Sequence, residues 1–171
     1  MRNVDIPEDV TIRRSAPADA EAFRSALDVV ARERRWLGFL EAPSLEEVVL
    51  FLTRSRPIQF LAERDSRVVG WCDITPRDRE GFRHSGTLGM GILPGFRGMG
   101  IGKALLVHAV DAALDAGLTR IELEVFASND TAIRLYTWAG FNEEGRKRRA
   151  RILDGVEEDT LLMALLSPGR G

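Results

Sequence analysis

The sequence contains one cysteine, one tyrosine and two histidines among its 171 residues. Cys72 has no partner within the chain for a disulfide, and a cage of cysteine thiolates around zinc is excluded. This low cysteine content is typical of a reducing compartment. We therefore expect a cytoplasmic protein that binds no metal.

The chain also lacks a dominant charge and a long hydrophobic run. Its 24 Lys and Arg against 26 Asp and Glu leave a formal net charge of -2, which gives no overall attraction to nucleic acid or anionic lipid. The basic run 146–149 has acidic neighbours and indicates a solvated strand. No uncharged apolar stretch approaches the roughly 20 residues of a membrane span, and acidic residues near the start do not fit a signal peptide. We expect neither a nucleic-acid partner nor a membrane partner.

Length and hydrophobic periodicity predict one α/β domain over residues 1–171, with its core at about 10–166. Alternating apolar residues and turn signals predict strands around Val10 and Ile12, at 58–63, 67–75, 84–93 and 121–125, and a final hairpin around Asp154-Gly155. Apolar residues at three- and four-residue spacing predict helices from Pro17, after Ser44, from the glycine cluster to Gly117, and at 130–139.

The glycine cluster lies where a strand ends and the longest helix begins. Gly98, Gly100 and Gly102 leave several backbone N–H groups without shielding side chains, at the helix end that attracts anions. Arg97 and Lys103 add full charges for phosphate oxygens. A Walker A loop is excluded because Arg97 and Ala104 stand where it needs Gly and Ser or Thr, and the G-x-G-x-x-G spacing of dinucleotide sites also fails. A tight strand-to-helix turn without a ligand is the alternative.

Two motifs give the chain a family resemblance. Arg97, Gly100 and Gly102 match R/Q-x-x-G-x-G/A, and about thirty residues later Asn129 to Phe141 is similar to N-x-x-A-x-x-L-Y-x-x-x-G-F. The chain thereby resembles the GCN5-related N-acetyltransferases (GNAT superfamily) from about residue 12 to 166. The resemblance implies an α/β GNAT-type fold: a mixed, mostly antiparallel central sheet of about seven strands, flanked by about four helices, with splayed fourth and fifth strands.

The same resemblance implies acetyl-CoA as cosubstrate and a set of residues around it. The pantetheine arm would pair with the exposed edge of the fourth strand, where an N–H near Ile92 would face the thioester oxygen. Asn129 would contact the cofactor as well as cap a helix, and Tyr136 would protonate the departing thiolate as general acid. The expected cofactor-binding residues are Met90, Gly91, Ile92, Arg97, Gly98, Met99, Gly100, Ile101, Gly102, Lys103, Asn129 and Tyr136.

No residue inherits the role of general base. Several family members carry a glutamate on the fourth strand near the position of Thr87, so the base must come from elsewhere. Glu122 and Glu124 alternate on one face of the fifth strand, and His84 titrates in the useful range. These three are the candidates, although charged residues alternating on a strand more often form a solvated face and a lone histidine is more often a surface residue. Asp73 and Glu41 are further candidates.

Three functions are compatible with these features. The leading hypothesis is direct transfer of an acetyl group to a primary amine of a small molecule in a ternary complex. A protein N-terminus is an alternative acceptor, and a catalytically idle acyl-CoA-binding or regulatory module is an alternative function. A nucleotide-binding protein is a third. Trp36, Phe39, Glu41 and the loop 76–84 are expected rims of the acceptor pocket, and the sequence leaves open whether the chain forms a homodimer.

Overall fold

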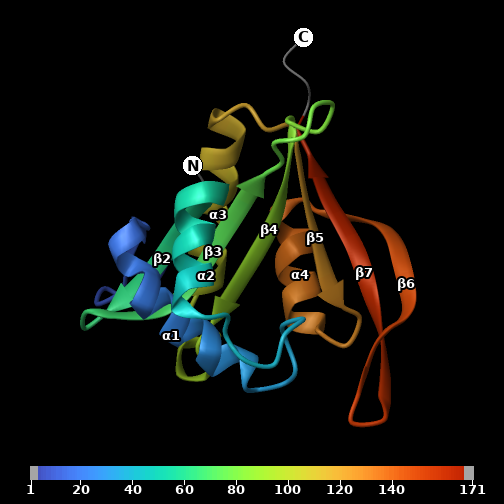
Figure 1. Cartoon of the computed structure of the whole chain (residues 1–171), viewed down its shortest axis with the longest axis horizontal. Helices are drawn as coiled ribbons and strands as arrows, with labels where there is room; N and C mark the ends of the chain where they lie inside the picture. Colours follow the sequence, from blue (N-terminus) through green and yellow to red (C-terminus); the bar gives the residue numbers. More distant parts are fainter. Residues whose placement is uncertain (1–3, 168–171) are drawn as a thin grey trace.

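The computed structural model describes residues 4–167, which form one seven-stranded sheet (Figure 1). The strand order is β1-β2-β3-β4-β5-β7-β6, and every neighbouring pair is antiparallel except the parallel pair β4–β5. The strands are β1 (Thr11–Arg14), β2 (Ile58–Arg64), β3 (Arg67–Pro76), β4 (Ser85–Ile92), β5 (Arg120–Phe126), β6 (Asn142–Leu153) and β7 (Val156–Leu166).

Four α-helices connect these strands, and local signals define their ends. The helices are α1 (Ala20–Ala31), α2 (Leu45–Leu50), α3 (Ile101–Asp115) and α4 (Asp130–Ala139), and a π-helical turn (Phe51–Ser55) extends α2. Ser44 and Glu47 form a capping box at the start of α2, the helix predicted after Ser44. Gly140 ends α4 with a left-handed φ of 103°.

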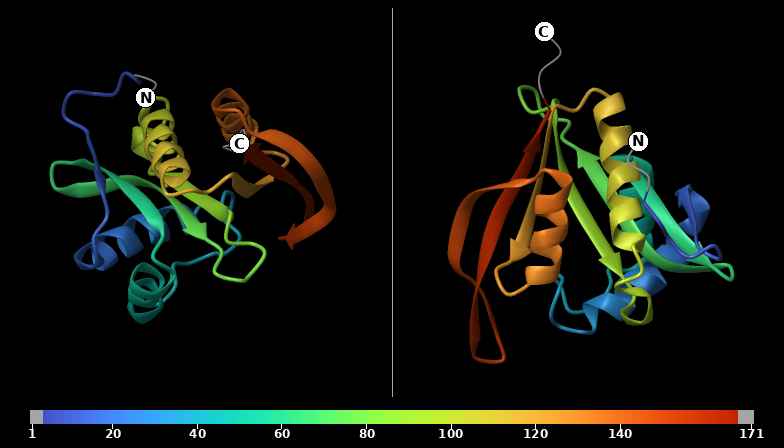
Figure 2. Two further views of the ribbon diagram at one scale, coloured as in Figure 1. Left: turned by 90° about the horizontal axis from the view of Figure 1, so that it is seen from above. Right: turned by 180° about the vertical axis from the view of Figure 1, so that it is seen from behind.

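The helices cover both faces of the sheet in pairs. Figures 1 and 2 show α1 and α2 on one face and α3 and α4 on the other. Side chains alternate accordingly: Trp71 of β3 packs into the cluster under α1 and α2, whereas its neighbour Cys72 packs into the larger cluster under α3. Ile121, Leu123 and Val125 of β5 are also buried on the α3 side, so Glu122 and Glu124 point to the α1–α2 side.

The parallel pair β4–β5 is short. Pairing is confined to residues 85–87 of β4 and 120–122 of β5. Beyond Thr87 and Glu122 the two strands diverge, as Figure 1 shows. The mixed seven-stranded sheet, the four helices and the splayed fourth and fifth strands predicted from the family resemblance are therefore confirmed.

Two searches of the described residues bear on other classes of protein. No helix within residues 4–167 is long and apolar enough to cross a membrane. In the same part of the chain, no three His, Cys, Asp or Glu side chains converge on a point where they would bind a metal ion.

Candidate functional site

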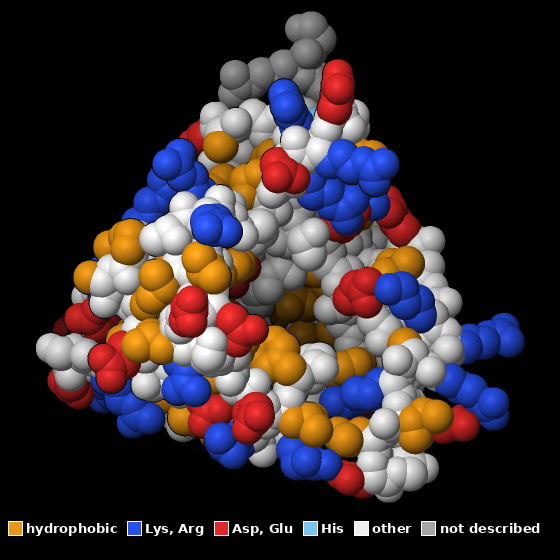
Figure 3. All heavy atoms as spheres, in the orientation of Figure 1, with side chains coloured by type: hydrophobic (Ala, Val, Ile, Leu, Met, Phe, Trp, Pro, Cys, Tyr) orange, Lys and Arg blue, Asp and Glu red, His pale blue; other side chains and the backbone are white. Residues whose placement is uncertain are grey.

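A cleft of about 810 Å³ opens where β4 and β5 separate. Figure 3 shows it as a hollow near the centre of the face that α1 and α2 cover, with hydrophobic side chains at its floor. Its walls come from β4, the glycine loop, β5, α4 and the connection between α1 and α2. Of the expected cofactor-binding residues, ten line it: Met90, Gly91, Ile92, Arg97, Gly98, Gly100, Gly102, Lys103, Asn129 and Tyr136. Met99 and Ile101 do not.

Strand β4 presents unpaired peptide groups to this cleft. The N–H of Leu93 donates to the carbonyl of Val69 on β3. Because peptide groups alternate in direction along an antiparallel strand, those of Met90 and Ile92 point away from β3, toward the gap. Strand β5 does not pair with β4 there. The exposed edge that the family resemblance predicted is present. The peptide group of Met90 and the N–H of Ile92 are in place for an extended ligand, whereas the Ile92 carbonyl accepts a hydrogen bond from Arg97.

Gly91 is required on this strand by close packing beneath it. A Cβ atom at Gly91 would lie 2.3 Å from the Trp71 ring, closer than any side chain could tolerate. The same lack of a side chain keeps the strand's edge open to a ligand backbone.

The loop before α3 has the geometry of an anion site. Gly100 caps the helix with a left-handed φ of 80°, and no side chain caps the exposed N–H groups of the first turn. A Cβ at Gly100 would also collide with the carbonyl oxygen of Asp5, at 2.3 Å. Lys103 lines the cleft in that first turn, with its ammonium 4.9 Å from the Trp138 ring centroid. Backbone donors, the helix dipole and a lysine therefore meet at one end of the cleft.

Arg97 is positioned differently from the sequence expectation that its charge would face phosphate. Its guanidinium makes two bonds to the carboxylate of Glu33, at 2.5 and 2.9 Å, and Nε donates to the carbonyl of Ile92 at 3.0 Å. The hydrogen bonds from this guanidinium keep the pKa of Glu33 below its usual value. Arg97 thus connects β4 to the segment after α1, whose Trp36 also lines the cleft.

Tyr136 lies in the cleft wall with most of its ring buried. It faces inward from α4 and packs against Phe141, with 5.9 Å between ring centroids. Burial raises the pKa of the phenol above its usual value, and the nearby Cys72 adds to the effect. The hydroxyl is therefore fully protonated at neutral pH, which is the state a proton donor needs. Asn129 caps the same helix by accepting the N–H of Ala132 at 3.1 Å.

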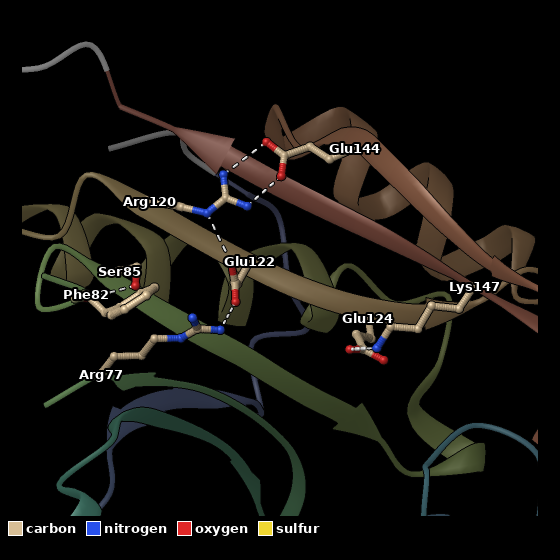
Figure 4. Close-up of polar contacts among 8 residues, drawn as sticks. All are labelled: Arg77, Phe82, Ser85, Arg120, Glu122, Glu124, Glu144 and Lys147. Carbon is tan, nitrogen blue, oxygen red and sulfur yellow. Dashed lines mark hydrogen bonds and ion pairs between the residues drawn. The ribbon is translucent and has the colours of Figure 1, made fainter. Parts of the chain in front are cut away.

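Glu122 and Glu124 share a face of β5 but have different surroundings (Figure 4). Glu122 lies between two guanidiniums: it accepts from Arg120 at 3.0 Å and from Arg77, and it does not line the cleft. Glu124 lines the cleft, and within residues 4–167 its one ion pair is with Lys147 of β6, at 2.5 Å. Of the two, Glu124 is the carboxylate that a bound ligand would meet.

Asp73 lies beneath the cleft on the same sheet face. It stands in register with Gly89 of β4 and Gln59 of β2, and a Cβ at Gly89 would be 3.5 Å from both carboxylate oxygens. Burial raises the pKa of Asp73 to about 7. The Gln59 amide lies near enough to lower that pKa in part, without the geometry of a full hydrogen bond. Asp73 is thus a buried carboxyl that titrates near neutrality.

The structure does not bring every predicted residue to the cleft. His84 is exposed before β4, and Glu41 lies on the exposed connection that follows α1; neither lines the cleft. Trp36 lines it as expected for an acceptor rim, whereas Phe39 does not. The sequence reading missed the polar and aromatic side of α4. The periodic spacing of Thr131, Arg134, Leu135 and Trp138 is the signal that would have identified it.

Comparison with known proteins agrees with this architecture. The Acetyltransferase (GNAT) family matches residues 25–141. An acetyltransferase of the GNAT family from Streptococcus pneumoniae superposes with a TM-score of 0.85 at 28% identity, over 93% of this chain and 99% of that one. The chain belongs to the GNAT acetyltransferase family.

Two further similarities bear on cofactor and acceptor. The putative acetyltransferase yncA from Salmonella typhimurium, solved with its cofactor acetyl-CoA, shares the fold with a TM-score of 0.86 at 19% identity, over 94% of this chain and 95% of that one. The [ribosomal protein bS18]-alanine N-acetyltransferase of Escherichia coli K12 is 40% identical over 72 residues, 42% of this chain and 49% of that protein. The chain thus spans about half the length of the curated relatives of this type.

Proposed function

We propose that this protein is an N-acetyltransferase that transfers the acetyl group of acetyl-CoA directly to a primary amine of a small molecule. The observation that supports this most is the convergence, in one cleft, of an unpaired strand edge, an uncapped helix N-terminus and a protonated phenol. The strand edge suits the pantetheine arm of acetyl-CoA, the helix N-terminus suits its pyrophosphate, and the phenol suits the departing thiolate.

The residues of the cleft fit acetyl-CoA. Met90, through its peptide group, and Ile92, through its N–H, would pair with the amides of the pantetheine arm. The N–H groups of the first turn of α3, with Lys103, would bind the pyrophosphate, and the Asn129 amide also lines the cleft. When bound, acetyl-CoA supplies an acetyl group that is already activated as a thioester.

Glu124 is the proposed proton acceptor. An alkyl amine with a pKa of ~10.4 is mostly protonated at neutral pH and must lose a proton before it can attack a carbonyl carbon. Glu124 is the candidate carboxylate on the cleft surface, directly or through a water molecule. Asp73, beneath Gly89, is a second candidate because its pKa is close to neutrality.

Tyr136 is the proposed proton donor. A new C–N bond forms as the C–S bond breaks, so the sulfur gains an electron pair and needs a proton. The phenol hydroxyl supplies that proton, and the proton lost by the amine balances it. The ring's packing against Phe141 holds the hydroxyl in a fixed direction.

Purified protein supplied with acetyl-CoA and a panel of primary amines tests the proposal through release of free thiol. We expect amine-dependent release, with kcat reduced about 100-fold in Tyr136→Phe. Thr137→Ala, an exposed change at the next position of α4, is the matched control and should keep full activity. Acetyl-CoA binding without thiol release on any amine would instead establish an idle acyl-CoA-binding module.

A protein N-terminus is the second candidate acceptor, and one observation favours it. The segment that matches the Escherichia coli bS18-alanine N-acetyltransferase is 40% identical over 72 residues. A peptide beginning with alanine belongs in the same panel. If it is acetylated with a kcat/KM at least ten times that of every small amine, the acceptor is a polypeptide and the small-molecule assignment is wrong.

A further inference from the structure

A second cavity, of about 430 Å³, lies beside the paired end of β4 and β5. It is enclosed by the loop between β3 and β4 and by the π-helical turn after α2. Its lining is rich in arginine and hydroxyl groups, and Asp78 is the one carboxylate among the lining residues. The side chains that matter here are Arg54, Arg77, Arg79, Thr75, Thr87 and Phe82.

The positive charge of this cavity exceeds what the protein itself neutralises. Arg77 is paired with Glu122. Within residues 4–167, neither Arg54 nor Arg79 forms an ion pair with a carboxylate, although both border the same cavity. The Phe82 ring contacts two guanidiniums: its centroid is 5.9 Å from that of Arg77 and 5.7 Å from that of Arg79. Guanidinium charges that line one cavity without carboxylate partners favour an anion among them.

The cavity and the proposed reaction site lie along the same face of β4. Thr75 and Thr87 are in register across β3 and β4, on the face that also carries Gly89. Gly89 lines the cleft, two residues beyond Thr87. Two to three residues of strand span roughly 7 to 10 Å. A molecule with its amine at the cleft would therefore reach the arginines with a group several bonds away.

We infer that this arginine cavity binds an anionic oxygen group, a carboxylate or a phosphate, at the far end of the amine acceptor. Arg54 and Arg79 bind the oxygens as guanidiniums bind planar or tetrahedral oxyanions, with the hydroxyls of Thr75 and Thr87 as further donors. This inference rests on the proposed function and narrows it: the acceptor is an acidic amine, and diamines and neutral amines are poor substrates.

Amines matched in length test this selectivity. The series is 6-aminohexanoate, 5-aminopentyl phosphate, hexylamine and 1,6-diaminohexane, each assayed for thiol release with acetyl-CoA. We expect kcat/KM to be at least about tenfold higher for the better of the two acidic amines than for hexylamine, with the difference shrinking in high salt. Comparison of the carboxylate with the phosphate identifies which anion the cavity prefers.

Charge-removing variants connect that selectivity to the cavity. In the double variant Arg54→Gln and Arg79→Gln, KM for the preferred acidic amine should rise at least about tenfold while hexylamine turnover stays unchanged. Arg56→Gln removes the same charge two residues from Arg54 but outside the cavity, so it is the matched control and should change neither value. Equal losses for acidic and neutral amines in the double variant would contradict the inference.

A binding measurement separates failure of this inference from failure of the proposed function. Calorimetry with N-acetyl-6-aminohexanoate and with N-acetyl-5-aminopentyl phosphate, without acetyl-CoA, should detect binding that the double variant loses. If hexylamine or the diamine is acetylated as well as both acidic amines, the anion site is refuted and the acetyltransferase stands. If no amine releases thiol, the acetyltransferase fails, and absence of binding by both acetylated compounds then refutes the anion site as well.

Discussion

The two ends of the β4–β5 pair are built in opposite ways. At the paired end, residues 85–87 and 120–122 share main-chain hydrogen bonds, and an ion-pair chain runs from Arg77 through Glu122 and Arg120 to Glu144. At the open end the strands share no hydrogen bonds, glycines replace side chains on β4, and an apolar floor lies below. The hydrogen bonds and ion pairs of the paired end hold β4 and β5 together there, and the cleft lies where the two strands have separated.

The comparison is sharpest for two carboxylates on one strand. Glu122 and Glu124 are two residues apart and point to the same face of β5, yet their side chains are 24% and 56% exposed. Two guanidiniums hold Glu122, whereas Glu124 has one lysine partner and borders the cleft. The two glutamates are the same in sequence, but Glu122 stabilises the paired end of the strands, whereas Glu124 faces the cleft where a ligand can reach it.

The largest expected effect separates these two glutamates. Glu124→Gln should lower kcat at least about 100-fold, since it removes the proposed proton acceptor, and should leave acetyl-CoA binding unchanged. Glu122→Gln is the matched control and should lower kcat less than about tenfold. Steady-state kinetics of thiol release measures both. Equal losses of kcat in the two variants would show that Glu122 and Glu124 do not differ in their roles. If Glu124→Gln keeps its activity, Asp73 becomes the candidate for the general base.

Asp73 lies between the two ends, and its expected effect is on stability. Its pKa rises from an ordinary 3.8 to about 7, so the folded state keeps the proton to higher pH than the unfolded chain. Burial of Asp73 therefore costs stability progressively from about pH 4 to pH 7 and fully above that range. Relative to the native protein, Asp73→Asn should gain about 2 to 3 kcal/mol of unfolding free energy between pH 5 and pH 8. Urea unfolding at both pH values measures this gain, and a pH-independent difference would contradict the raised pKa.

Gly91→Ala tests how tightly the open end is packed. The added Cβ would lie 2.3 Å from the buried Trp71 ring, so strand or ring must shift, at a cost of about 2 kcal/mol in unfolding free energy. Gly95→Ala is the control, because nothing lies within 4 Å of its added Cβ. Urea unfolding of both variants is the measurement. Equal stability would show that this strand edge has more space than the structure indicates.

The smallest expected effect concerns the ion pairs of the paired end. Arg120→Gln removes the link between Glu122 and Glu144 and should cost about 1 kcal/mol at low salt and less in 1 M salt, because these pairs are partly solvated. Arg32→Gln removes a more exposed pair with Asp28 and should lower the unfolding midpoint by less than Arg120→Gln does. Unfolding midpoints at two salt concentrations test both values. A loss that does not depend on salt would mean that Arg120 acts through packing.

Local sequence was sufficient for most of the fold and for the position of the cleft. The capping box of Ser44 and Glu47, the turn at Asp65-Ser66 and the terminal Gly140 each depend on contacts within a few residues, so their signals are readable in the chain. The glycine loop at 97–102 and the segment 129–141, which contains Tyr136, were also recognisable because their motifs are local. The roles of these cofactor and proton-transfer residues stay predictions until the protein is assayed.

Contacts between distant residues decided the rest. Arg97 meets Glu33 across 64 positions, Arg77 meets Glu122 across 45, and Asp73 is buried by strands on both sides. Charge pairing and desolvation act through space, so nothing in the letters distinguishes Glu122 from Glu124 or marks Asp73 as a carboxyl with a raised pKa. The sequence by itself determined which elements form and where the glycine loop begins the longest helix, because both depend on contacts between residues close in the chain. Only the tertiary structure decided which charged groups are neutralised and which remain available to a ligand.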